Sequence, residues 1–175
     1  EDAWEVTERN TSSRMVVQAG PESPDATPLY DHGLRGENQR IGVLDSNVDS
    51  EHCSFVDGTQ PIGPDHRKIH AYNAPQDAVF HGTHVAATAL GDAGFEDDTR
   101  GVAYEARLVY NLTPSFSNGA ALTRLELHAA QGANVHCNSW GDDNTTDYNT
   151  LARAFDVFHW ENEDQLAMLA VTNGE

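Results

Sequence analysis

Positive charge is the scarcest property of this sequence. Lys and Arg together number 10, against 28 Asp and Glu, and the formal net charge is −18. Binding to nucleic acid or to an anionic membrane requires clustered positive charge, so we expect neither as a partner. An acidic surface is instead common in secreted or salt-adapted proteins.

Long apolar runs and cysteines are also few. No run of about 18 apolar residues is present, so we expect a soluble protein without a membrane-spanning segment. The first ten residues, EDAWEVTERN, lack the basic start and apolar core of a signal peptide. Cys53 and Cys137 are too few for a disulfide framework. They either form one bridge or remain as two buried thiols that pack as small hydrophobes.

What is present predicts one α/β domain. The 175 residues are enough for a sizeable core. Residues 1–40 are rich in turn formers, as in PESPDATP, and we expect them to form an N-terminal arm. Beyond residue 40, strands are expected at 41–44, 69–72, 107–111, 134–137 and 167–171, and helices at 81–90, 120–131 and 148–160. This alternation predicts a parallel β-sheet covered by helices on both faces.

The strongest chemical signal is FHGTHVAATALG at residues 80–91. It places His81 at the start of an Ala-rich helix, and an upstream apolar strand, IGVLD, ends in Asp45. An acid at a strand end followed by a His at a helix start supplies two members of an Asp–His–Ser nucleophilic system, in that chain order. Asp45 should emerge at the carboxyl end of a parallel strand, where open α/β sheets place their sites.

Several separated motifs follow the order of subtilisin-like serine proteases, and the sequence resembles that family from about residue 14 to residue 175. IGVLDSNVD resembles its catalytic-Asp strand, HGTHVAAT its catalytic-His helix, GVAYEARLV its next strand, NSWG its substrate-binding strand and LAVTN its oxyanion-hole turn. NVHCNSWG is similar to the alkaline branch. The resemblance implies that residues 41–175 are the N-terminal part of a three-layer subtilisin-like catalytic domain in a serine endopeptidase.

The resemblance also implies roles for individual residues. Asp45 would orient His81, the general base, and the Asn173 side chain would donate to the developing oxyanion. Asn173 precedes a glycine, so this pair is also simply a strong turn signal. His84 lies one helical turn after His81 and is its rival as the base, although in this motif it reads as structural. The pair His81 and His84 is a weak zinc candidate because no third ligand is spaced nearby.

A second group would bind the substrate. Ser139, Trp140 and Gly141 match the strand edge along which an extended peptide forms backbone hydrogen bonds. The sequence departs from the family pattern at Asn47, at Ala87, where the family has Gly, and at Val171-Thr172, where it has Ala-Gly. Asn47 stands where the family usually has Gly, and we expect a benign replacement because Asn tolerates a left-handed backbone. Thr172 also replaces a Gly, and a β-branched residue does not tolerate such a backbone.

The family's GTS-type nucleophile motif does not occur in this sequence. The chain alone therefore lacks the serine for acyl transfer, and we expect that serine on a companion fragment or a downstream segment. The alternatives are a catalytically inactive, peptide-binding pseudoprotease and a part of a longer protease. The resemblance further implies a secreted, processed product.

No cofactor is required by this chemistry, and calcium is the one ion that the sequence leaves open. Residues 91–101, GDAGFEDDTRG, offer carboxylates but lack the D-x-D-x-D-G spacing of an EF-hand loop. A solvated acidic loop is therefore favoured over a structural calcium site.

Overall fold

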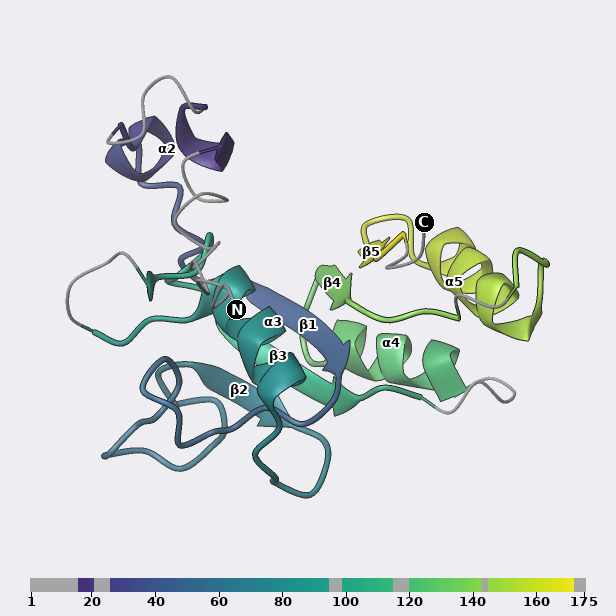
Figure 1. Ribbon diagram of the computed structural model, residues 1–175, viewed down its shortest axis with the longest axis horizontal. Helices are drawn as coiled ribbons and strands as arrows, with labels where there is room; N and C mark the ends of the chain where they lie inside the picture. Colours follow the sequence, from purple (N-terminus) through teal and green to yellow (C-terminus); the bar gives the residue numbers. More distant parts are fainter. Residues whose placement is uncertain (1–15, 21–25, 95–98, 115–119, 143–144, 172–175) are drawn as a thin grey trace, which may run out of the picture.

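The computed structural model describes residues 16–20, 26–94, 99–114, 120–142 and 145–171. Five strands form one sheet (Figure 1): β1 Arg40–Asp45, β2 Ile69–Tyr72, β3 Arg107–Leu112, β4 Val135–Asn138 and β5 Leu166–Leu169. Their order is β2-β3-β1-β4-β5, and every neighbouring pair is parallel. The predicted α/β fold with a parallel sheet is confirmed.

In the described part of the chain from residue 26 onward, the helices are α2 Pro28–Asp31, α3 Phe80–Leu90, α4 Ala120–Ala130 and α5 Thr150–Glu161. After α4 the chain turns at Gly132, which has a φ of 84°, a left-handed conformation that Gly adopts without strain. At the start of α5, the Asn149 side chain accepts hydrogen bonds from two backbone amides of the first turn. The ends of α3, α4 and α5 lie within two residues of the predicted ones.

The helices cover both faces of the sheet. Successive side chains of a strand point to opposite faces, and on β1 the buried Val43 and Leu44 do so. Val43 belongs to a core cluster with residues of α3, whereas Leu44 packs with residues of α4 and α5. Figure 1 shows α3 crossing β1 and β3.

Tyr30 brings the N-terminal arm into the core. Tyr30, in the single turn of α2, is buried, and its hydroxyl donates to the carbonyl of Val102 at 2.8 Å. Its ring meets Tyr104 edge to face, with centroids 5.2 Å apart. One turn is too short to give a helical period, and the sequence does not predict α2.

Of the two alternatives left open for the cysteines, the structure shows the free thiols, although only one of them is shielded from solvent. Cys53 and Cys137 are both free, and Cys53 is exposed rather than buried. The Arg67 side chain donates to the carbonyls of Cys53 and Val56, which fixes the Cys53 loop at the surface. Cys137 is half-buried on β4 and packs against the core cluster of Val43.

None of the helices in the described part of the chain combines the length and apolar character needed to cross a bilayer.

Candidate active site

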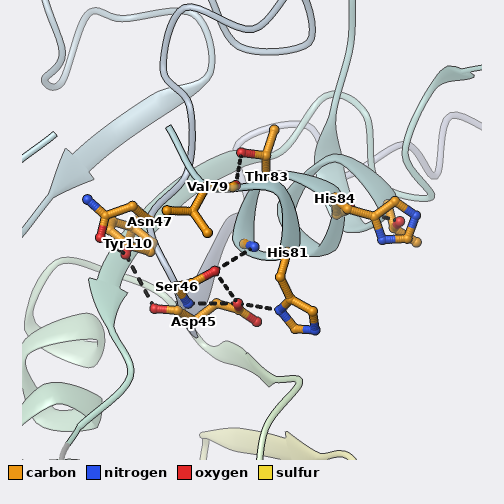
Figure 2. Close-up of polar contacts among 10 residues, drawn as sticks. Asp45, Ser46, Asn47, Val79, His81, Thr83, His84 and Tyr110 are labelled. Carbon is orange, nitrogen blue, oxygen red and sulfur yellow. Dashed lines mark hydrogen bonds and ion pairs between the residues drawn. The ribbon is translucent and has the colours of Figure 1, made fainter. Parts of the chain in front are cut away.

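Asp45 and His81 form a hydrogen-bonded pair at the carboxyl edge of the sheet (Figure 2). Asp45 is the last residue of β1, and His81 lies in the first turn of α3. The His81 Nδ1 atom is 2.6 Å from Asp45 Oδ1. A carboxylate only accepts, so Nδ1 carries the proton and Nε2 is the basic nitrogen of the neutral ring. The Asp45 side chain is 2% exposed and that of His81 is 58% exposed, so the acid is shielded while the base remains accessible.

Ser46 connects this pair to the helix. Its backbone amide and its hydroxyl both donate to Asp45 Oδ1, at 2.7 and 3.2 Å. The same hydroxyl oxygen accepts from the backbone amide of Gly82 at 2.9 Å. Sequence reasoning did not assign Ser46 a role, although a small polar residue beside a candidate catalytic acid is a usable signal.

Gly82 allows α3 to approach residues 46–49, which follow Asp45 and are here called the Asp45 loop. A Cβ built at this position would lie 1.9 Å from the carbonyl oxygen of Ser46 and 2.8 Å from that of Asn47. The next residue, Thr83, accepts from the amide of Asp49 at 2.9 Å through its hydroxyl. The start of α3 is therefore held against the loop by its backbone and by a side chain.

His84 lies away from this pair. Its exposed ring stacks on Phe80 with centroids 5.9 Å apart, and Figure 2 shows it pointing away from Asp45. Among the described residues, no group of three or more His, Cys, Asp or Glu side chains is arranged to hold a metal ion.

Asn47 uses ordinary backbone geometry, which corrects the reason expected for its presence. Among the described residues other than glycine, Asn38 alone has a positive φ. The tolerance of Asn for left-handed backbone is therefore not what this position uses. Its buried side chain makes hydrogen bonds with the Pro75 carbonyl and the Tyr110 hydroxyl.

The residues predicted to bind substrate follow β4 at the same edge. Leu44 pairs with Asn138, so Ser139 comes level with Asp45 in the parallel register. Ser139 and Trp140 are half-buried, and Gly141 is exposed. The Trp140 ring lies against Phe155 of α5, with centroids 6.2 Å apart. The sheet thus brings this segment beside the Asp45–His81 pair.

Asn173 and Thr172 lie outside the described residues, and their predicted roles stay predictions. The same is true of most carboxylates in the acidic loop. Of the described ones, Asp92 accepts from the Arg100 side chain at 3.1 Å and from the amide of Gly94 at 2.9 Å.

Comparison with known proteins gives consistent matches. The sequence model of the subtilase family matches residues 36–175. The serine protease/ABC transporter B family protein tagA of Dictyostelium discoideum is 28% identical over 183 residues, which cover 95% of this chain and 10% of tagA. The CspB protease of Clostridium perfringens has a similar fold, with a TM-score of 0.62 and 17% identity over 95% of this chain and 41% of CspB.

The self-cleaved protease domain of PatA matches with a TM-score of 0.54 and 25% identity, over 80% of this chain and 52% of that domain. The chain therefore spans about half of these solved proteases and a tenth of tagA.

Proposed function

Because this chain belongs to the subtilase family of proteases, we propose that it supplies Asp45 and His81 to the Asp–His–Ser triad of a serine endopeptidase. The observation that carries the proposal is the 2.6 Å contact between a shielded carboxylate and an accessible imidazole. The nucleophilic serine then lies on a companion or downstream segment, here called the serine segment.

In this mechanism His81 Nε2 takes the proton of the serine hydroxyl as its oxygen attacks the peptide carbonyl. The imidazolium that forms is stabilised by Asp45, and it later gives the proton to the leaving amine. Asn173 would donate to the oxyanion, a contribution whose loss costs on the order of 10²–10³ in turnover. Ser139, Trp140 and Gly141 would bind the extended peptide along the edge beside Asp45.

An incompletely covered sheet face supports the existence of the serine segment. Val43, Cys137 and Met168 lie side by side in register on β1, β4 and β5. Exposure rises along this row: Val43 is fully buried under the α3 cluster, Cys137 is half-buried and Met168 is 48% exposed. An apolar face of this kind calls for a covering element. The solved relatives are about twice as long as their match to this chain, which leaves enough residues to supply one.

Labelling with a fluorophosphonate probe, followed by denaturing separation and mass analysis, tests the proposal. A label on a second polypeptide or on a downstream segment supports it. His81→Ala should abolish this label, whereas His84→Ala, which alters an exposed His on the same helix, should keep it. Absence of label from every polypeptide of the purified protein would contradict the proposal and favour an inactive peptide-binding module.

Secretion is a further part of the proposal. The net charge of −18 and the processed proteases that the sequence resembles support it. Immunodetection of the protein in culture medium and in washed cells tests it, and retention inside the cells would contradict it.

A further inference from the structure

The Asn47 side chain links the loop that follows Asp45 to the segment that leads into the helix of His81. We propose that Asn47, held in place by Tyr110, is a positioning residue that fixes the distance between Asp45 and His81. This inference rests on the function proposed above for the pair, and it assigns a role to a side chain that the family usually lacks at this position.

The first contact runs from the Asp45 loop to the segment before α3. Asn47 Nδ2 donates to the carbonyl oxygen of Pro75 at 2.7 Å, and the Asn47 residue is 8% exposed. Pro75 lies between β2 and the start of α3 at Phe80. A buried amide hydrogen bond therefore ties the loop that follows Asp45 to the chain that leads into the His81 helix.

The second contact anchors the same loop to β3. The Tyr110 hydroxyl lies 3.3 Å from the carbonyl oxygen of Asp45 and 3.3 Å from Asn47 Oδ1, so its single proton is shared between them. Tyr110 is fully buried, and its burial raises the pKa of its hydroxyl, which therefore remains a donor.

Tyr72, beside Tyr110, makes further contacts with the same loop. The Tyr72 ring packs on Tyr110 with centroids 4.5 Å apart. The Tyr72 hydroxyl donates to the carbonyl of Val48 at 2.8 Å and accepts from the amide of Val48 at 3.2 Å. Tyr72 of β2 and Tyr110 of β3 thus both bind the backbone of residues 45–48.

Two side chains that belong to the Asp45 loop consequently link it to α3 and its leading segment, in addition to the Thr83 hydroxyl described above. Ser46 reaches the amide of Gly82, and Asn47 reaches the carbonyl of Pro75. A glycine at position 47 would keep the first link and lose the second. Since Asn47 does not use left-handed backbone, the side chain itself is the reason for the residue.

Asn47→Gly and Asn47→Ala test the inference in the protein together with its serine segment. We expect kcat to fall by about ten- to a hundredfold, because small misplacements of catalytic groups cost this much. KM should stay unchanged, since Asn47 is buried. The pH dependence of kcat/KM should change, and the NMR signal of the His81 Nδ1 proton should broaden or disappear. Tyr110→Phe removes the hydroxyl that donates to Asp45 and Asn47, and it should also lower kcat and weaken the His81 signal.

Asn73→Ala is the matched control. Asn73 Nδ2 donates to the Tyr110 carbonyl at 3.0 Å and to Gln131 Oε1 at 2.8 Å, in the same neighbourhood but without touching the Asp45 loop. It should lower the free energy of unfolding while leaving the pH profile and the His81 signal as in the wild type.

The outcomes separate the two proposals. An Asn47 variant that folds, with a His81 Nδ1 signal and pH profile no different from those of Asn73→Ala, overturns the positioning role. If the Asn47 variants do not fold, Tyr110→Phe decides by the same readouts. The NMR signal requires no serine, so a protein that takes no fluorophosphonate label refutes the proposed function and still allows the positioning role to be judged.

Discussion

Gly82 is the residue at which α3 meets the Asp45 loop. A Cβ there would lie 1.9 Å from the Ser46 carbonyl oxygen, which is backbone and has no freedom to turn away. Gly82→Ala should therefore push α3 from the loop and lower the free energy of unfolding by about 1–3 kcal/mol, as overpacking does. Chemical denaturation measures this change.

Gly58→Ala is the control for that substitution. Gly58 is exposed, and a Cβ there would meet no atom within 4 Å. The Gly58→Ala variant should have the same midpoint of denaturation as the wild type. Equal midpoints for the two variants would show that the close approach at Gly82 does not matter for stability.

The Asp45 carboxylate determines which His81 nitrogen carries the proton. Asp45→Asn offers an amide that favours the other tautomer, and in a serine protease triad such a change lowers kcat by about 10⁴-fold while leaving the geometry intact. We expect this loss in the protein with its serine segment, measured by steady-state hydrolysis of a peptide ester. Asp92→Asn, in the acidic loop, should retain activity, and a similar loss in both variants would argue against a special role of Asp45.

At the scale of elements, α4 packs on the sheet through two stacked histidines. The His128 and His136 rings are nearly parallel, with centroids 5.7 Å apart, and both are buried. They fit because Gly42 lies beside them: a Cβ at Gly42 would come 2.4 Å from His128 Nδ1. No hydrogen-bond partner among the described residues reaches either ring nitrogen of His128. A charge on His128 would be buried without a partner, so this ring must be neutral in the folded state.

This pair predicts acid sensitivity. Burial, followed by the proximity of His136, lowers the pKa of His128 from 6.5 to about 3. Burial also lowers the pKa of His136. As the pH falls below 6.5, His128 becomes protonated in the unfolded chain but stays neutral in the folded chain. The free energy of unfolding therefore decreases progressively down to about pH 3.

His128→Leu should remove part of this acid sensitivity. The difference in unfolding free energy between pH 7 and pH 5 should shrink relative to the wild type, as measured by urea denaturation at both values. His32→Leu is the control, because His32 is exposed and is solvated whether or not the chain is folded. An undiminished difference in His128→Leu would mean that other groups cause the acid sensitivity.

At the scale of the whole molecule, the sheet is covered on both faces near β1 but remains exposed toward β5. Met168→Lys places a charge at the exposed end of the row formed by Val43, Cys137 and Met168. We expect weaker association with the serine segment, or lower stability where the two are one polypeptide, because a Lys there would be buried without a partner. Co-purification or thermal denaturation measures the effect.

Leu34→Lys is the control for Met168→Lys. Leu34 is also an exposed apolar residue, but it lies in the N-terminal arm. It should leave association and thermal stability unchanged. Equal behaviour of both variants would argue that the β5 face is not a contact surface.

Most of the fold follows from short-range patterns in the sequence. The apolar strand before Asp45, the helix that starts at His81 and the turn at Gly132 each depend on neighbours within a few residues. The pairing of Asp45 with His81 follows from the parallel sheet together with the family resemblance. The exposure of Cys53 and the reason for Asn47 could not be predicted, because both depend on loop paths that no local pattern encodes.

The sequence by itself therefore determined the α/β class and the positions of the five strands and of α3, α4 and α5, and it predicted Asp45 and His81 as the acid and the base. Periodicity and turn chemistry act locally, so they can be read along the chain. Only the tertiary structure decided that Ser46 and Asn47 link the Asp45 loop to α3, that His84 points away, and that the β5 face is exposed. These features arise where segments distant in sequence meet, and their geometry is determined by packing across the sheet.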